Sequence, residues 1–346
     1  MRTELFDYEL PESAIAQRPS EERGASRMLE IGEQLIDRSA GDFAELVPAG
    51  ALVVLNDTRV RRARLLGERM PGGGKAEIFL LHPVDASRKC WSALGRANKP
   101  LRPGTELRIA GEHVVVRDRL EDGTLLVELF VAESALGVEG WLERQGHVPL
   151  PPYVRRPDDA SDGERYQTVF ARELGSVAAP TAGLHLSTSA LERLGERGVD
   201  VQTLTLHVGI GTFRPVSSDD LDEHPMHAEH IEVSDALCAR VNLARAAKRP
   251  VIAVGTTVVR ALESAAEGGE LRPFSGETRL LIQPGYRFRA VDGLLTNFHM
   301  PKSTLLALVS ALVGRERLLA SYREALARGY RFLSYGDAMW IPRRLV

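Results

Sequence analysis

The chain has 346 residues, of which 44% are hydrophobic and 26% are charged, and its formal net charge is −3. This composition excludes a wholly disordered, collagen-like or coiled-coil chain. Because a single hydrophobic core stops growing at roughly 250 to 300 residues, we expect two domains. The slightly negative charge gives no overall field that would attract polyanions, so any contact with nucleic acid must be regional.

Three features of the sequence predict the cellular compartment: the number of cysteines, the first ten residues and the most apolar run. The only cysteines, Cys90 and Cys238, are too few for a disulfide framework, which is typical of a reducing compartment. The first ten residues carry four charged side chains and no apolar stretch, so we expect no secretory signal and a cytoplasmic protein. The most apolar run, Thr304–Val313, is about half the ~20 residues that cross a bilayer, which predicts a buried helix and no membrane contact.

A short apolar strand, Ala51–Leu55, comes first in the chain. From about Arg59 to Val131 the hydrophobic pattern then has a period of two, with glycine-containing turns between the apolar runs. Six short strands favour a small closed barrel, because closure removes exposed sheet edges. The predicted strands are Arg59–Met70, Ala76–Val84, Cys90–Leu94, Thr105–Ile109, Val114–Leu120 and Thr124–Phe130.

The rest of the chain alternates between helices and strands. A helix near Glu133–Gln145 is followed by Pro149, Pro151 and Pro152, which end any regular element. Beyond them we expect an α/β fold, a mixed sheet with helices on both faces in three layers. The barrel, residues 59–152, is then inserted into an α/β domain made of residues 1–58 and 153–346. The expected elements are a helix at Ser189–Arg197, a strand at Val201–Val208, a helix at Asp235–Ala247 and a strand-turn-helix at Val251–Ala265.

Polar residues follow the first strand, at a position where α/β sheets bind ligands. Asn56 or Asp57 could hold a ligand hydroxyl, or the pair could form an Asx turn that only closes the connection. A dense basic run starts directly afterwards and includes Arg59 and Arg61. Alternate members of a strand share a face, so these two arginines could bind phosphates together. The other interpretation is a solvated edge strand protected by charge.

Two glycine-containing turns carry histidines. The stretch Pro180–His185 precedes a helix for which Ser189 and Glu192 match a capping box. His185 could act as an acid or base near neutral pH, or it could be a packed histidine. The second turn, His207–Phe213, ends a strand but lacks the third glycine and the following helix of a dinucleotide-binding fingerprint.

A strand also leads directly into a helix at Gly255-Thr256-Thr257. Free amide groups at that helix start favour an anion or a ligand hydroxyl, with Arg260 and Glu263 further along the helix. The other interpretation is that Gly and Thr are simple caps, as in many such turns.

The run Leu295–Thr304 is richer, because a strand end with Asn297 and His299 precedes Ser303 at the start of the apolar helix. A ligand carboxylate would be well placed at that helix start, unless Ser303 only caps the helix. Near the C-terminus, Ser334–Asp337 could add a carboxylate and an aromatic ring to the same crevice.

Three histidines recur every third residue, at His224, His227 and His230, with Glu229 beside them. This spacing raises the alternative of a zinc site. Pro225 indicates a loop rather than a helix that would present all three rings, so we expect no metal.

No single motif above specifies a reaction, but their order does. The motifs are Phe6–Pro11, Asn56–Val60, Pro149–Tyr153, Glu164–Val169, Pro180–His185, Thr205–Phe213, Gly255–Thr257, Thr296–His299 and Ser334–Met339. Together they span practically the whole chain, which resembles the S-adenosylmethionine:tRNA ribosyltransferase-isomerases of queuosine biosynthesis. The chain departs from that family at Gly24, where Asp is usual, and at Leu186-Ser187, where Phe-Thr is usual. These departures concern substrate contacts rather than the reaction.

The resemblance implies an enzyme that transfers and isomerises the ribosyl part of S-adenosylmethionine onto 7-aminomethyl-7-deazaguanine at the wobble position of tRNA. Adenine and methionine leave, and epoxyqueuosine-tRNA is the product. S-adenosylmethionine is consumed as the donor, and no other cofactor is implied. The family fold, a β-barrel inserted in an α/β domain, agrees with the organisation expected from periodicity.

That chemistry needs a base beside the ribose C5′, whose hydrogens are made acidic by the neighbouring sulfonium. His185, His207 and His299 are the candidates for the base or acid, and Asn297 or a second histidine could donate to the departing adenine. The other expected substrate contacts, which would seat the methionine carboxylate, the ribose hydroxyls and the sulfonium, are Asn56, Asp57, Thr181, Gly183, Gly209, Gly211, Thr212, Gly255, Thr256, Thr257, Arg260, Glu263, Ser303, Tyr335 and Asp337.

For tRNA, we expect phosphate contacts from Arg59, Arg61, Arg155 and Arg156, in a protein that acts as a monomer. One alternative is an S-adenosylmethionine-dependent tRNA methyltransferase, which would give up only the methyl group. A second alternative is a non-catalytic RNA-binding module. The barrel would suffice for that module, but the polar strand ends of the α/β domain would then be unexplained.

Overall fold

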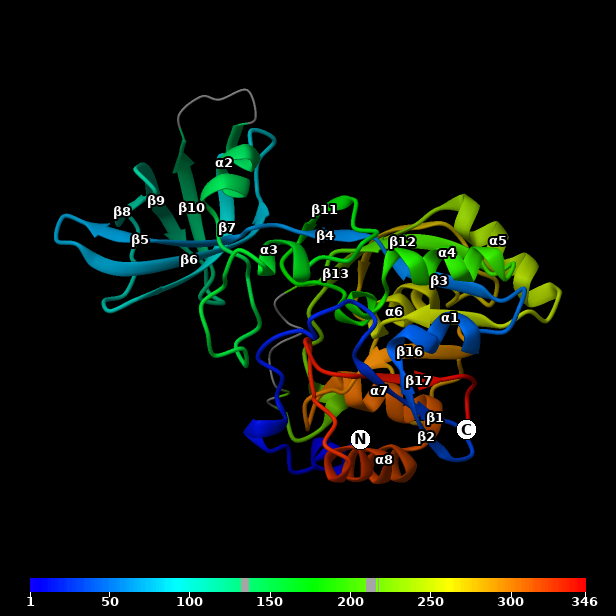
Figure 1. Cartoon of the computed structure of the whole chain (residues 1–346). Coiled ribbons are helices and arrows are strands. Elements are labelled where there is room, and N and C mark those ends of the chain that lie inside the picture. The colour runs from blue at the N-terminus through cyan, green and yellow to red at the C-terminus, as the bar shows by residue number, and fades with distance from the viewer. Residues whose placement is uncertain (132–136, 210–215, 217) are drawn as a thin grey trace.

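The computed structural model describes residues 1–131, 137–209, 216 and 218–346 (Figure 1). Its centre is a nine-stranded sheet in which β12, β3, β14 and β16 are parallel neighbours. Strands β16 and β17 are antiparallel, whereas β17 and β1 are parallel, so the predicted mixed sheet is confirmed. The strand order is β15 (Phe274–Thr278), β13 (Glu229–Val233), β12 (Asp200–Leu206), β3 (Leu52–Asn56), β14 (Val251–Val254), β16 (Gly293–Asn297), β17 (Ala338–Ile341), β1 (Arg27–Ile31) and β2 (Leu35–Ser39).

Helices cover both faces of this sheet, as the sequence predicts (Figure 1). Successive residues of a strand point to opposite faces, so Leu52 and Val54 of β3 pack with one group of helices and Val53 and Leu55 with the other. The first group is α5 (Asp235–Ala246), α6 (Thr256–Ala265), α7 (Thr304–Val313) and α8 (Arg315–Ala327), and the second is α1 (Phe43–Leu46) and α4 (Thr188–Glu196). Strands buried on both faces explain the continuous apolar runs of the sequence.

The order of the central strands locates a crevice. Strand β12 follows β3 in the chain and lies on one side of it, whereas β14, the next of the parallel strands, lies on the other side. Connections that leave the carboxyl ends of β3 and β14 therefore run apart. The crevice between them is where open α/β sheets bind ligands.

A closed six-stranded barrel is inserted between β3 and β12, as predicted, and it stands to one side of the sheet (Figure 1). All neighbouring strands pair antiparallel, and Trp91 and Leu129 are fully or almost fully buried in its core. The strands are β5 (Arg64–Met70), β6 (Gly74–Pro83), β7 (Cys90–Ala97), β8 (Glu106–Ile109), β9 (Glu112–Arg119) and β10 (Leu125–Phe130).

Two local predictions were wrong. The predicted strand Arg59–Met70 is two strands, β4 (Thr58–Val60) and β5, because β4 pairs with β11 (Glu173–Ser176) outside the barrel and the chain turns before entering it. Helix α4 begins one residue before the predicted Ser189. Ser187 is its cap, and its hydroxyl accepts a hydrogen bond from the amide of Ala190.

The remaining elements are short, apart from the buried helix predicted at Thr304–Val313, which α7 confirms with its last eight residues buried. No helix in the part of the chain that the structure describes is both long and apolar enough to span a membrane. The helix predicted from Glu133 is described from residue 137 onward. The short elements are η1 (Thr3–Phe6), η2 (Glu12–Ala14), η3 (Ala40–Asp42), α2 (Gly137–Gln145), α3 (Asp162–Arg165), η4 (Thr181–His185) and η6 (Leu221–Glu223).

Candidate active site

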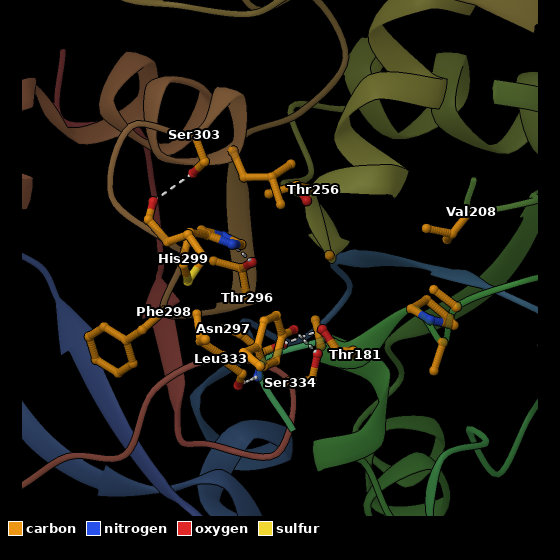
Figure 2. A pocket seen from close by; sticks show the side chains of 18 of the residues that line it. Thr181, Val208, Thr256, Thr296, Asn297, Phe298, His299, Ser303, Leu333 and Ser334 are labelled. Carbon is orange, nitrogen blue, oxygen red and sulfur yellow. Dashed lines mark hydrogen bonds between the residues drawn. The ribbon is translucent and has the colours of Figure 1, made fainter. Parts of the chain in front are cut away.

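A cavity of about 370 Å³ lies at the carboxyl ends of β14 and β16 and at the amino ends of α6 and α7 (Figure 2). Its volume is in the range of small-molecule sites. Arg155 is the only charged side chain among its described lining residues. The predicted site residues that line it are Thr181, Gly255, Thr256, Thr257, Asn297, His299, Ser303 and Arg155.

Asn297 is held by three hydrogen bonds at the end of β16, and Figure 2 labels it beside two of its partners, Thr181 and Leu333. Its Nδ2 donates to the carbonyl oxygen of Leu333 (3.2 Å) and pairs with Nε2 of His185 (2.9 Å). Its Oδ1 accepts from the Thr181 hydroxyl at 2.9 Å. The structure therefore brings together three segments that lie far apart in the sequence, η4, β16 and the chain before β17.

His185 lies behind Asn297 and does not line the cavity. Its Nδ1 is 2.7 Å from the hydroxyl of Ser26, so both ring nitrogens have protein partners. Burial, and secondarily the charge of Arg331, lower the pKa of His185 to about 4. The imidazole is consequently neutral at physiological pH.

His299 is the imidazole on the cavity wall. Its Nε2 is 3.1 Å from the Thr296 hydroxyl, and its backbone is fixed because its amide donates to the Tyr322 hydroxyl and its carbonyl accepts from Tyr8. Burial lowers the pKa of His299 to about 3. No described residue hydrogen-bonds its Nδ1, which leaves that nitrogen available to a ligand.

The start of α6 offers amide groups to the cavity. Gly255 has a φ of 96°, which favours glycine, and its amide donates to Leu295. Asn56 donates to the Thr257 hydroxyl and so steadies the turn from the neighbouring strand. The amide groups of Thr256 and Thr257 have no hydrogen-bond acceptor in the described parts of the chain. Thr256 is only 6% exposed, and its hydroxyl likewise has none there.

The start of α7 is different, because Ser303 is occupied by the helix itself. Its hydroxyl accepts from the amide of Leu306 and donates to the carbonyl of Met300. The neighbouring Lys302 forms an ion pair with Asp7 at the surface. Ser303 therefore caps α7, as the alternative interpretation of the sequence had it.

Six predicted contacts are not among the residues that line the cavity, and each has partners within the protein. Asn56 donates to the carbonyl of Leu206 and accepts from its amide. Arg260 forms a buried ion pair with Glu229, and the Tyr335 hydroxyl donates to Asp162. The remaining three are carboxylates, which we assign to structural roles. Asp57 accepts from Thr205 and Arg172, Asp337 accepts from the amides of Arg27 and Arg331, and Glu263 accepts from Tyr286 and the amides of residues 289–291.

His207 and the glycines around it are also elsewhere. Its Nδ1 is 2.8 Å from the Thr58 hydroxyl, its ring stacks on His230, and burial is the main cause that lowers its pKa. A Cβ on Gly183 would lie 2.7 Å from the Phe170 ring, so close packing requires this glycine. The Gly209 amide donates to Glu229. The predicted contacts Gly211 and Thr212 lie outside the described residues.

The four arginines predicted to bind phosphate all have protein carboxylates as partners. Arg61 is buried, and its Nε and Nη2 donate to the two oxygens of Glu139. Arg156 forms the same kind of bidentate pair with Asp162. We therefore assign these two to structural roles. Arg155 and Arg59 are exposed, and their partners are Glu12 and Glu143.

Sequence reasoning missed Ser26 and Tyr153. Ser26 lies 159 residues before the histidine that it contacts, so no local spacing connects them. Tyr153 lines the cavity, and its hydroxyl is 2.5 Å from that of Ser334. The available signals were that Tyr153 ends the motif Pro149–Tyr153 and that Ser26 lies two residues after the departure at Gly24.

The described residues contain no group of three or more His, Cys, Asp or Glu placed to hold a metal ion. In the suggested histidine cluster, Glu229 is paired with Arg260 and His230 with Glu232.

Comparisons with known proteins agree on one family. A family model described as "Queuosine biosynthesis protein" matches residues 3–341. A protein of Sorangium cellulosum named S-adenosylmethionine:tRNA ribosyltransferase-isomerase is 53% identical and covers 99% of this chain and 98% of its own. A protein of Anaeromyxobacter dehalogenans with the same name is 50% identical over 99% of this chain and 100% of its own. The crystal structure of the S-adenosylmethionine tRNA ribosyltransferase of Thermotoga maritima has a TM-score of 0.55 and 31% identity, covering 97% of this chain and 99% of that one.

Glu263→Gln should destabilise the fold, because one oxygen cannot accept the four hydrogen bonds that the carboxylate accepts. We expect the free energy of unfolding to fall by about 2 kcal/mol or more, as for a buried donor left unsatisfied. Urea unfolding measures it. Glu316→Gln, at a side chain that is 91% exposed, is the matched control. Equal stabilities of the two variants would contradict the structural assignment of Glu263.

Stability should also fall in mild acid because of His185 and His299. In the unfolded chain both rings take up a proton below their ordinary pKa of 6.5, whereas in the folded chain they resist protonation down to about 4 and about 3. Their contribution is therefore complete above pH 6.5. It decreases by about 1.4 kcal/mol per pH unit for each ring as the pH falls towards the folded pKa values. We expect urea unfolding at several pH values to show that the free energy of unfolding depends less steeply on pH in His299→Gln than in the wild type, by the amount for one proton. An unchanged pH dependence would contradict the effect of burial on this ring.

Proposed function

The chain belongs to the queuosine biosynthesis protein family, and from this we propose that the cavity binds S-adenosylmethionine as a ribosyl donor for tRNA. The protein is an S-adenosylmethionine:tRNA ribosyltransferase-isomerase. The observation that carries this conclusion is similarity of about 50% identity to proteins of that name along virtually the entire chain. No comparable observation favours the methyltransferase alternative.

The acceptor that we propose is 7-aminomethyl-7-deazaguanine at the wobble position of tRNA. Its amino group takes the ribosyl part, which is isomerised to give epoxyqueuosine, and adenine and methionine leave. We further propose that the donor is the only small molecule required, and that the protein works as a cytoplasmic monomer. An acceptor base reaches a recessed site most readily when it leaves its stack.

The methionine carboxylate of the donor is proposed to bind at the start of α6. The Thr256 and Thr257 amides and the buried Thr256 hydroxyl are unused there, and the helix dipole favours an anion. Arg155, the one cation on the described lining, is held by both oxygens of Glu12. Because Glu12 already pairs with Arg155, we propose that amide groups, rather than an ion pair, bind the carboxylate of the donor.

His299 is proposed as the base that removes a C5′ proton from the donor. Its ring lies on the cavity wall, and no described residue hydrogen-bonds its Nδ1, so this nitrogen can face a bound donor. The sulfonium beside C5′ supplies the activation of that carbon. His207 is less suited, since the ring lies outside the cavity lining and is hydrogen-bonded to Thr58.

For tRNA phosphates we propose a surface at one end of the barrel. Arg96, Lys99 and Arg119 border a hollow of about 200 Å³ whose described lining contains no carboxylate. None of the three forms an ion pair with a described residue, unlike the four arginines that the sequence suggested. Neighbouring like charges without counterions are suited to a phosphate backbone.

The products test the reaction. The protein incubated with S-adenosylmethionine and tRNA carrying the aminomethyl base should release adenine and methionine in proportion to the ribosyl group found on tRNA. Chromatography of the small molecules and of digested tRNA measures both. S-adenosylhomocysteine without adenine would instead identify a methyltransferase.

Salt dependence tests the barrel surface. Arg119→Ala should weaken tRNA binding and reduce the slope of log affinity against log salt by about 0.7 to 0.9, the value for one phosphate contact. Arg343→Ala, at an arginine 69% exposed on the α/β domain, is the matched control. A slope that is the same in wild type and Arg119→Ala would place the phosphates elsewhere.

A further inference from the structure

Four buried or partly buried side chains form one hydrogen-bonded chain that ends at the cavity. It runs from Ser26 to His185 (2.7 Å), then to Asn297 (2.9 Å) and to Thr181 (2.9 Å). Asn297 is only 3% exposed, and it lines the cavity together with Thr181, as Figure 2 shows. His185 and Ser26 are buried behind them.

The partners fix the direction of every hydrogen bond in this chain. The carbonyl of Leu333 can only accept, so the Asn297 atom that faces it at 3.2 Å is the amide nitrogen. The second N–H of that nitrogen donates to Nε2 of His185, which must then carry a lone pair. A neutral imidazole with an unprotonated Nε2 has its proton on Nδ1, and this proton faces the hydroxyl of Ser26.

Asn297 consequently has no N–H group left for a ligand. Its carbonyl oxygen has two lone pairs, of which the Thr181 hydroxyl uses one. The Asn297 side chain therefore presents only an acceptor to the cavity and cannot donate a hydrogen bond to adenine.

We propose that the Asn297 oxygen binds the positively charged sulfonium of the donor, and that His185 and Ser26 are positioning residues that hold this oxygen in place. The inference rests on the proposed function, because that function supplies the sulfonium. No carboxylate lies among the lining residues that the structure describes, so a positive sulfur must be stabilised by neutral oxygens. Asn297 offers the oxygen whose orientation is most completely determined.

His185 is thus a positioning residue and not the base. A base must reach the proton that it removes, and His185 is outside the cavity lining with both nitrogens occupied by Ser26 and Asn297. The lowered pKa of this buried ring agrees with the neutral imidazole that the hydrogen bonds require.

Binding without any acceptor tRNA tests the sulfonium contact. S-adenosylmethionine and S-adenosylhomocysteine differ by a methyl group and by the charge on sulfur, so their affinity ratio reports recognition of that charge. Asn297→Leu should weaken S-adenosylmethionine about tenfold and S-adenosylhomocysteine by no more than about twofold, as for loss of a charge-assisted contact. Calorimetry measures both affinities. Equal weakening of the two ligands would overturn the proposal and point to the adenine amino group instead.

His185 variants test the positioning role, and they also serve if Asn297→Leu does not fold. His185→Gln can place an oxygen where Nε2 lies and still accept from Asn297, whereas His185→Phe cannot. We expect His185→Phe to lower the preference for S-adenosylmethionine and to reduce kcat/KM at least tenfold, with His185→Gln recovering most of both. The pH dependence of kcat/KM should keep its shape in His185→Gln.

If His185 were the base, the two variants would lose activity alike, by about 10²- to 10⁴-fold, and the acidic limb of the profile would change. That result would overturn the positioning role. Failure of the proposed function has a different signature. Wild-type protein would then release no adenine with any tRNA, while the affinity ratio could still be measured.

Discussion

The hydrogen bond between Asn297 and His185 connects residues 112 positions apart and joins the end of β16 to the η4 turn. Both groups are buried, and a buried amide or imidazole without a partner costs about 1 to 3 kcal/mol, so each holds the other in one orientation. Leu333, from the segment before β17, adds the third anchor. One wall of the cavity is therefore set by mutual satisfaction of polar groups rather than by apolar packing alone.

Arg155 is the only charged side chain in the described lining of the cavity, and this suits the proposed donor, which carries charges of both signs. An S-adenosylmethionine molecule carries a carboxylate, an ammonium and a sulfonium. Fixed side-chain charges would attract one of these and repel another. Helix amides at Thr256 and Thr257 and neutral oxygens at Asn297 and Thr181 supply weaker, directional partners instead. Protein hydrogen bonds already orient Thr257, Asn297 and Thr181, so under the proposed function these partners are in place before a donor binds.

Two sets of basic side chains in this protein differ in environment and physical role. Arg61 and Arg156 are withdrawn from solvent and paired with carboxylates, and they fasten the polypeptide where it passes between barrel and sheet. Removing one partner of such a pair would leave a poorly solvated charge, which makes them structural. Arg96, Lys99 and Arg119 stay exposed and unpaired with any described carboxylate on the barrel. An overall charge of −3 conceals this regional difference.

The sequence by itself determined the periodicities, and hence the α/β sheet, the inserted barrel and the buried helix at Thr304–Val313, because hydrophobic spacing reports directly which faces are buried. It also marked Asn297, His299 and Thr256 as residues at strand ends. Only the tertiary structure decided which of the marked residues share a cavity. Glu263, Asp337 and Arg260 have the same chemistry as ligand contacts, but backbone amides or a carboxylate from other segments bind them. Burial and partner choice depend on contacts between residues that are tens to hundreds of positions apart, and no local pattern encodes those contacts.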